Sequence, residues 1–311
     1  MAEPSWMMDA LNGLGVPAAP GAEIAPDAPG SPRQSFHDAI LPPVLQAAVA
    51  RLNPELPEPA LEEVVRRVTD PVYATDPVAE NRRLHGLMKD GVPVTFLMGG
   101  EERNARARLI DWTDAENAWA VYNQVDIVGK AARRPDALIY LNGLPLVVVE
   151  LKALDGGDME AAHNQIETYK SDIPELFRTA LVSVISDGFN ARYGTISAGL
   201  DRFMCLRTVD GETVIKDTER APVDVLTHGL LTPRVLLDML RWFTVFEDEG
   251  AGPIKKVAGY HQYHAVRKAV EGVEAARGGD GKGGVIWHTQ GSGKSLLMAF
   301  LSDALMHAPE M

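Results

Sequence analysis

The clearest pattern along the chain is a pair of short apolar segments, residues 137–141 and residues 145–151, separated by Asn142-Gly143. Asn-Gly between two such segments is typical of a type I′ turn, because both central residues of that turn need a positive φ. The second segment stays apolar until it reaches Glu150, a pattern that indicates a central strand covered on both faces. We therefore predict a β-hairpin in the core of the protein.

Other segments show either helical spacing or strand-like runs of apolar residues. Helices are predicted over residues 35–53, 59–68, 77–91, 159–171, 222–230 and 232–246. Further strands are predicted over residues 93–98, 107–112, 118–128, 179–185, 191–196 and 202–208. Asp76-Pro77 before one helix is an N-cap followed by proline in the first turn, and Gly91 suits its C-terminal cap. Strands on both sides of a long helix predict an α/β core with a mixed sheet flanked by helices.

Composition divides the chain into four parts. The first part is rich in Ala, Pro and Gly, so we expect a flexible segment with one short helix over residues 6–14. An acidic, glycine-containing linker, residues 247–258, marks the expected boundary between a large α/β domain, helical at its C-terminal end, and a second domain. The four expected parts are residues 1–33, 34–246, 247–258 and 259–311.

Charged residues stand at the ends of the hairpin strands: Asp136 begins the first strand, and Glu150 and Lys152 end the second. Residues two apart on a strand share a face, so Glu150 and Lys152 lie together. Two carboxylates can hold Mg²⁺, with the main-chain carbonyl of Leu151 as a third ligand. The cation would acidify a bound water and neutralise charge on phosphorus, while Lys152 orients that water or stabilises the oxyanion. Together these residues predict phosphodiester hydrolysis, although each one taken singly is also explained as an ordinary charged strand end.

A second motif near the C-terminus has the parts of a phosphate-binding P-loop: an expected strand over residues 284–287, a glycine-containing loop and a helix. Backbone amides of such a loop bind phosphate, its lysine neutralises phosphate oxygens and its hydroxyl residue binds Mg²⁺. One position departs from the usual pattern, because His288 stands where the first glycine is expected. The residues expected to bind nucleotide in this loop are Gly291, Ser292, Gly293, Lys294 and Ser295.

The string RRPDALIYLNGLPLVVVELK, which ends at Lys152, contains the PD-(D/E)xK motif of a large group of nucleases. It resembles the nuclease domain of the restriction (R) subunit of type I restriction-modification enzymes. Gln165 and Tyr169 match the QxxxY motif that accompanies this nuclease. The resemblance implies a PD-(D/E)xK restriction-endonuclease-like core followed by the beginning of a RecA-like P-loop domain. It also implies that Asp136, Glu150 and Lys152 are catalytic and that both carboxylates are metal ligands.

Three further roles follow from this resemblance. Gln165 and Tyr169, one helical turn apart, would reach DNA phosphate or support Lys152, unless the tyrosine simply packs against the sheet. Gln262 stands where the family's motor reads the adenine edge, although a glutamine near a helix start is commonly just solvated. Some nucleases of this type use a glutamate on an early helix as a metal ligand. For Glu80 we instead expect a surface residue that offsets the helix dipole.

The resemblance implies Mg²⁺-dependent cleavage of double-stranded DNA, in a complex whose methylase and specificity subunits recognise the target. ATP is implied as the cofactor of translocation by the full-length protein. Up to Met311 the chain holds only the start of a motor domain, so we expect an N-terminal portion of a larger polypeptide, without ATP turnover and with weak nucleotide affinity. Two other interpretations stay open: a nucleotide-binding protein with a relic carboxylate cluster, and a non-catalytic docking module.

Composition adds further limits. Of the 311 residues 46% are hydrophobic, and no apolar run is long enough to cross a membrane. The single cysteine, Cys205, is expected to be a buried structural thiol. The sequence shows no basic-then-apolar leader, so we expect a cytoplasmic protein. The formal net charge of −13 argues against a free-standing, non-specific DNA binder but allows DNA contacts through partners. We expect Arg133-Arg134 to contact phosphate and residues 103–108 to form a solvated basic edge.

Overall fold

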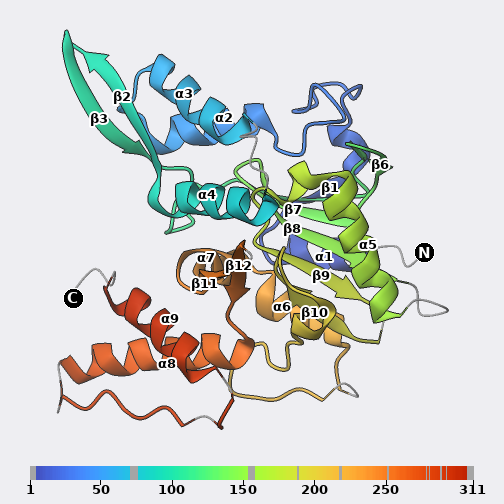
Figure 1. Cartoon of the computed structure of the whole chain (residues 1–311), viewed down its shortest axis with the longest axis vertical. Helices are drawn as coiled ribbons and strands as arrows, with labels where there is room; N and C mark the ends of the chain where they lie inside the picture. The colour runs from blue at the N-terminus through green and yellow to red at the C-terminus, as the bar shows by residue number, and fades with distance from the viewer. Residues whose placement is uncertain are drawn as a thin grey trace.

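A six-stranded mixed β-sheet forms the centre of the computed structural model (Figure 1). The structure describes residues 5–70, 76–152, 158–187, 189–216, 219–250, 252–277, 279, 281–287, 289–291 and 293–306. The strands are ordered β1, β4, β7, β8, β9 and β10 across the sheet. Their bounds in that order are Ala18–Pro20, Trp119–Asn123, Ala137–Leu141, Leu144–Leu151, Val182–Ser186 and Ala191–Gly194. The pairs β1–β4 and β8–β9 are parallel and the other neighbours are antiparallel, which confirms the predicted mixed sheet.

The predicted hairpin is confirmed as β7–β8, the two central strands. Asn142 has a φ of 52° and Gly143 a φ of 81°, so both turn residues occupy the left-handed region that Asn-Gly favours. The Asn142 side chain accepts a hydrogen bond from the amide of Ala118 and donates one to the carbonyl of Leu109. A Cβ atom at Gly143 would lie 2.7 Å from the carbonyl oxygen of Leu41, so this close approach requires glycine.

Helix α5, Met159–Asp172, connects the parallel strands β8 and β9 and covers one face of the sheet (Figure 1). Alternation along β7 places Leu138 and Tyr140 in the core beneath α5, together with Ile166 of the helix. Val147 and Val149 point to the opposite face, where they meet a larger core. That core also takes residues from α1 (Ser5–Gly13), α2 (Pro42–Leu52), α6 (Pro222–Leu230) and α7 (Pro233–Arg241). The central strands are therefore covered on both faces, as the apolar pattern predicts.

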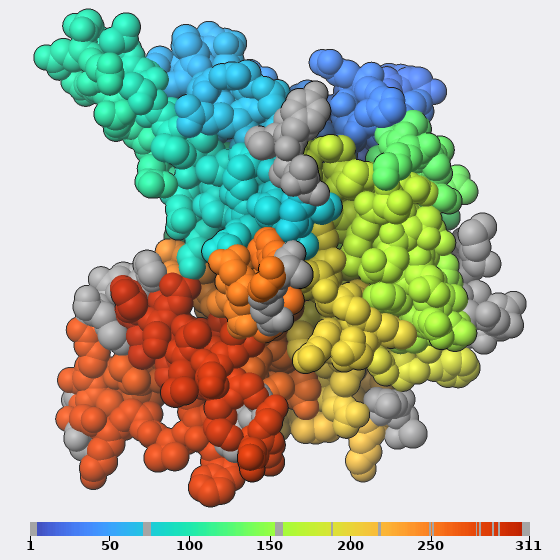
Figure 2. Space-filling model, viewed as in Figure 1, coloured from blue at the N-terminus to red at the C-terminus, as the bar shows by residue number. Residues whose placement is uncertain are grey.

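Helix α4, Pro77–Asp90, begins and ends as the sequence predicts. The Asp76 carboxylate accepts a hydrogen bond from the amide of Val78, and Gly91 follows the last turn with a φ of 83°. Next to α4 lie α3 (Glu58–Thr69) and a hairpin that projects from the body (Figure 2), formed by β2 (Val92–Met98) and β3 (Glu101–Ala107).

The remaining elements are short or belong to the C-terminal part of the chain. They are β5 (Ile127–Val128), β6 (Ala132–Arg133), β11 (Thr244–Glu249), β12 (Gly252–Val257), α8 (Tyr260–Arg277), α9 (Lys294–Met306) and three 3-10 turns, η1 (Gly21–Ile24), η2 (Pro174–Phe177) and η3 (Leu200–Arg202). Over the described residues, no helix combines the length and apolar character needed to cross a bilayer.

The N-terminal segment, expected to be flexible, and residues 247–258, expected to be a linker, both contain regular structure. Strand β1 adds an edge to the main sheet, and Leu11 of α1 is buried in the larger core, because its apolar side chain contacts the sheet face that α5 leaves open. Residues 247–258, expected to be a linker, lie mostly in a two-stranded hairpin of β11 and β12. The helix predicted to extend to Phe246 ends at Arg241, since Phe246 pairs with Lys255 in this hairpin.

Other predicted elements are shorter or shifted. The helix predicted from Ser35 begins at Pro42, where proline suits the first helical turn. The strand predicted over residues 107–112 is replaced by β3, which ends at Ala107 and pairs with β2 in the projecting hairpin. Residues 118–128 form two separate strands, β4 and β5, instead of one.

The segment 202–208 is not a strand of the sheet. It contributes one isolated bridge, between Tyr193 and Met204. Cys205 follows this bridge and is exposed, so the expectation of a buried structural thiol is wrong. Of the apolar residues around it, Phe203 and Leu206 are buried and Met204 packs partly against the core.

Candidate active site

Strand alternation brings Asp136 and Glu150 to one edge and one face of the sheet. The last antiparallel pair joins Ala137 to Val149, so Asp136 and Glu150 follow this pair on adjacent strands. Each lies two residues from a strand residue, Leu138 or Val148, whose side chain packs beneath α5, so both side chains are on that face of the sheet. Lys152 lies two residues beyond Glu150 and takes the same face. The fold thus gathers the three residues that the sequence predicted to be catalytic.

Hydrogen bonds fix the orientation of both carboxylates. Asp136 Oδ2 accepts from the main-chain amide of Leu151 at 2.7 Å. Glu150 is only 5% exposed; its Oε1 accepts from Lys152 Nζ at 2.6 Å. Its Oε2 accepts from the Tyr169 hydroxyl at 2.8 Å, across the interface between β8 and α5. A carboxylate offers about four acceptor positions, so both side chains keep lone pairs for a further ligand.

Burial raises the pKa of both carboxyl groups. Desolvation is the largest cause for Asp136, and the amide of Leu151 and the charge of Lys152 oppose it. Desolvation also raises the pKa of Glu150 most, repulsion from Asp136 adds to it, and the hydrogen bond from Lys152 opposes it. Burial and the adjacent Glu150 also raise the pKa of Tyr169, so its hydroxyl stays protonated and donates. The site therefore carries more negative charge than its surroundings stabilise, which a cation would relieve.

The donor set fits a hard divalent cation that keeps part of its water shell. Asp136 and Glu150 supply carboxylate oxygens, the ligand type that Mg²⁺ prefers. Among the described residues no group of three His, Cys, Asp or Glu side chains is arranged to hold a metal. Main-chain oxygen and water would therefore complete the coordination, which is common for Mg²⁺ because it usually binds through one or two carboxylates.

Gln165 contacts Tyr169, and Tyr169 contacts Glu150. Gln165 and Tyr169 lie on α5, one turn apart, and a hydrogen bond from Gln165 lowers the pKa of Tyr169. The tyrosine then contacts Glu150. Tyr169 also packs in the core beneath α5, so the packing interpretation and the polar role apply to the same residue.

The two predicted phosphate-contacting arginines have different surroundings. Arg133 Nε donates to Asp172 Oδ2 at 2.7 Å, and this ion pair joins β6 to the end of α5. Arg134 is exposed and lies two residues before Asp136. Within the described part of the chain neither Arg134 nor the exposed Lys130 is ion-paired. Arg134 is close enough to Asp136 to lower the pKa of that carboxyl.

The predicted P-loop is formed in part. Helix α9 begins at Lys294 and includes Ser295, as expected for the helix after such a loop. Residues 284–287 are exposed and belong to none of the described sheets, so the strand predicted there is not formed. His288 and Ser292 lie outside the described residues.

Gln262 contacts this loop and is not solvated. It is 5% exposed; its Oε1 accepts from the amide of Gly259 at 2.9 Å and its Nε2 donates to the carbonyl of Gly293 at 3.1 Å. Gly291 and Gly293 have positive φ values of 84° and 74°, which favour glycine. Together with Gln262 they line part of a groove of about 560 Å³, large enough to take part of a nucleotide.

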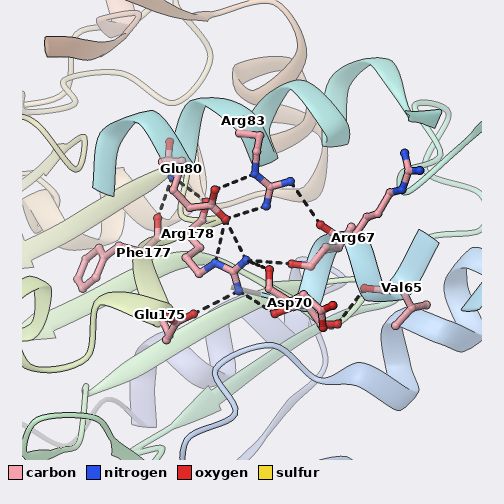
Figure 3. A network of polar contacts seen from close by, with 11 residues as sticks. Val65, Arg67, Asp70, Glu80, Arg83, Glu175, Phe177 and Arg178 are labelled. Atoms are coloured by element: carbon pink, nitrogen blue, oxygen red, sulfur yellow. Dashed lines mark hydrogen bonds and ion pairs between the residues drawn. The ribbon is translucent and has the colours of Figure 1, made fainter. Parts of the chain in front are cut away.

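Glu80 is buried and ion-paired, so the expectation of a surface residue is wrong (Figure 3). Arg178 donates to Glu80 Oε1 at 2.9 Å, and Arg83 donates to both carboxylate oxygens. Arg178 also donates to the carbonyls of Thr69 and Asp70 at the end of α3. The network joins α3, α4 and the segment before β9. Sequence patterns missed it, because Glu80 and Arg178 lie far apart along the chain and no local pattern links them.

Comparisons with known proteins identify the family of the chain. Residues 3–202 match the family model described as type I restriction enzyme R protein N terminus. This match includes all of the carboxylate site. Residues 261–311 match a second family model, described as SWI2/SNF2 ATPase, which includes the region around the predicted P-loop.

The curated relatives are named as endonuclease subunits of type I restriction enzymes. The type I restriction enzyme HindI endonuclease subunit of Haemophilus influenzae is 40% identical over 86% of this chain and 26% of its own length. The putative type I restriction enzyme MjaIXP endonuclease subunit of Methanocaldococcus jannaschii is 27% identical over 97% of the chain and 31% of its own length. The chain thus spans about a quarter to a third of these relatives. The match over residues 3–202 shows that it belongs to the type I restriction enzyme R protein family, as the N-terminal part of an endonuclease subunit.

Proposed function

We propose that this chain carries the nuclease of a type I restriction enzyme and cuts double-stranded DNA in a Mg²⁺-dependent reaction. The observation that carries the proposal is the pair of hydrogen-bonded carboxylates, Asp136 and Glu150, at one edge of the central strands with Lys152 beside them. Burial of two neighbouring carboxylates costs stability unless a ligand compensates their charge. The mixed sheet with α5 on this face supports a restriction-endonuclease-like core.

Asp136 and Glu150 are the residues that would hold the cation. When bound, Mg²⁺ would neutralise charge on the scissile phosphate and lower the pKa of an attacking water. The chain prepares both carboxylates for this task before any ligand arrives, since the Leu151 amide and the Tyr169 hydroxyl already fix their orientation. Such preorganisation avoids a rearrangement during the reaction.

Lys152 is placed to act on the phosphate or on the attacking water. One of its three N–H donors binds Glu150, so the other two would be available to a phosphate oxygen or to the attacking water. A charged ammonium close to the scissile phosphate stabilises the negative charge that develops there. Its contact with Glu150 keeps it next to the carboxylate pair instead of in solvent.

DNA would pass over the β5–β6 side of the site. Lys130 in the turn between these strands and Arg134 after them are exposed cations close to Asp136 in sequence. Such residues bind phosphate without reading sequence. The formal net charge of −13 supports a reliance on the methylase and specificity subunits for most of the DNA affinity.

The C-terminal part would serve nucleotide binding in the whole protein. Gln262 would read adenine, and the loop with Gly291, Gly293, Lys294 and Ser295 would bind phosphate, while ATP-driven translocation belongs to the complete subunit. The match of residues 261–311 to the SWI2/SNF2 ATPase model supports this assignment.

Calorimetric titration of Mn²⁺, a substitute for Mg²⁺, into the chain tests the proposal. We expect binding by the wild type and loss of binding in Asp136→Asn, with Asp126→Asn as the control because Asp126 is an exposed carboxylate ten residues earlier. Equal affinity in both variants, or no binding by the folded wild type, would reject the metal site and favour a docking module. Cleavage by the reconstituted complex should then depend on Asp136, Glu150 and Lys152.

A further inference from the structure

Helix α4 presents three polar residues on one face, Asn81, His85 and Lys89, spaced four residues apart. Each of them contacts a different part of the molecule. Figure 1 shows α4 between the main sheet and the C-terminal elements, and Figure 2 shows the β11–β12 region packed directly against it. Asn81 and Lys89 are separated by about 12 Å along the helix axis.

At one end Asn81 binds the chain that enters β9. Its fully buried amide Nδ2 donates to the carbonyls of Phe177 at 2.8 Å and Ala180 at 2.9 Å. Leu181 follows directly in the same segment. Its amide donates to the carbonyl of Leu146 at 2.7 Å, and this bond starts the pairing of β9 with β8. Asn81 therefore holds the point from which the β8–β9 register is set.

The β8–β9 pairing includes the residues predicted to be catalytic on β8. The parallel pairing runs from Val147–Val182 to Leu151–Ser186 and includes Glu150 opposite Ile185. The amide of Lys152 then donates to the carbonyl of Ser186 at 2.8 Å. Paired strands move together, because displacement of one breaks the whole ladder.

In the middle of α4, His85 contacts the β11–β12 hairpin. The centroid of its ring lies 5.4 Å from the centroid of the Phe246 ring, in an edge-to-face arrangement. Lys255 on β12 is 2% exposed, and its Nζ donates to the carbonyl of Ala180 at 2.8 Å. The hairpin thus meets both α4 and the carbonyl that Asn81 binds, and it leads directly into α8.

At the other end Lys89 binds α9, the helix that begins in the P-loop. Lys89 Nζ donates to Asp303 Oδ2 at 2.7 Å, and both side chains are about two-thirds to three-quarters buried. The same ammonium lies 5.6 Å from the centre of the Trp242 ring. A second contact braces the opposite end of α4, where Glu80 binds Arg178 (Figure 3).

We propose that α4 transmits the position of the P-loop helix α9 to the catalytic strands, so that a displacement of α9 changes the affinity of the carboxylate site for its cation. The inference rests on the proposed nuclease function for its effect, and on the contacts of Asn81, His85 and Lys89 for its route. A rigid helix that contacts α9 at one end and the entry to β9 at the other has the continuity that such coupling requires.

Two measurements on the chain test the coupling: the Mn²⁺ dissociation constant and the hydrogen-exchange rate of the Leu181 amide. We expect Lys89→Ala and Asp303→Ala each to change the dissociation constant by about fivefold, with faster exchange at Leu181. The double variant should change no more than either single one, because both remove the same contact. The exchanged pair, Lys89→Asp with Asp303→Lys, should restore the wild-type values.

Arg82→Ala is the matched control. Arg82 lies on the same helix as Lys89, and it pairs with Asp248 of β11 through a more exposed contact. This variant should leave both measurements unchanged. The coupling is rejected if the Lys89 and Asp303 variants lose only stability, or if the effects of the double variant simply add. If the wild type binds no Mn²⁺, the nuclease proposal fails, whereas the exchange rate of Leu181 still decides whether α4 connects α9 to β9.

Discussion

Tyr169 on α5 donates a hydrogen bond of 2.8 Å to Glu150 on β8, so the crossover helix holds a predicted metal ligand in place. The tyrosine is 3% exposed and packs beneath α5, and its position is therefore set by the core. Lys152 occupies the other oxygen of the same carboxylate. Glu150 is thus oriented from two sides, by one residue of its own strand and one residue of the helix.

Tyr169→Phe should weaken metal binding with little change in fold. The ring can keep its packing, but Glu150 loses a donor, so its pKa rises further and its charged form is less favoured. A lost hydrogen bond to a charged group corresponds to about 1.5–3 kcal/mol, or roughly tenfold to a hundredfold in the Mn²⁺ dissociation constant. Calorimetry at several pH values measures this, and the loss should be larger at lower pH. Tyr140→Phe is the control, since its hydroxyl donates to the carbonyl of Ala39 away from the carboxylates.

Asp136→Asn should stabilise the metal-free chain. Asp136 and Glu150 have raised pKa values in the folded state, so the folded chain binds protons more tightly than the unfolded chain. Stability therefore falls as pH rises above the ordinary values of about 3.9 and 4.3 through the raised values. The variant lacks one of these charges and should gain about 1 kcal/mol in urea unfolding at pH 7. The gain should disappear near pH 3, and Mn²⁺ should stabilise only the wild type.

Lys255→Met should be more stable than the wild type at acidic pH. Desolvation lowers the pKa of Lys255 to about 7, whereas the unfolded chain binds this proton up to an ordinary value of about 10.4. Wild-type stability therefore rises between these two pH values, and the full cost of the buried charge applies below pH 7. Replacing a buried charge by an apolar side chain gains about 1–4 kcal/mol in favourable cases. Thermal unfolding should show a smaller gain at pH 9.5 than at pH 6, while Lys256→Met, at the partly exposed neighbouring position, should show no such trend.

The central hairpin and the carboxylate site were predictable because their signals are local. Asn142-Gly143 fixes the turn, and strand alternation then places Asp136, Glu150 and Lys152 on one face. The caps of α4 are equally local. These features depend on neighbouring residues, so the sequence around them contains the information that determines them.

Other features depend on contacts between distant segments. The N-terminal residues join the sheet only because β4 offers them an edge, and residues 247–258 become a hairpin only because each strand finds the other. Glu80 has the pattern of a helix-dipole residue, and only the folded chain brings Arg178 to it. Gln262 likewise contacts Gly293 through a turn that no local pattern specifies.

Arg178→Ala should destabilise the chain strongly and leave the metal site intact. Arg178 is 7% exposed; it donates to Glu80 and to carbonyl oxygens at the end of α3, so its removal leaves the buried Glu80 carboxylate with Arg83 alone and these carbonyls without this donor. Removing one partner of a buried ion pair costs about 3–5 kcal/mol, and we expect the lower end of this range because Arg83 still binds Glu80. Glu80→Gln should cost less, because the amide oxygen still accepts from both arginines. Urea unfolding gives the free energies, and Mn²⁺ titration of Glu80→Gln gives the site affinity. A large loss of Mn²⁺ affinity in Glu80→Gln would instead make Glu80 a metal ligand, which its contacts with Arg83 and Arg178 argue against.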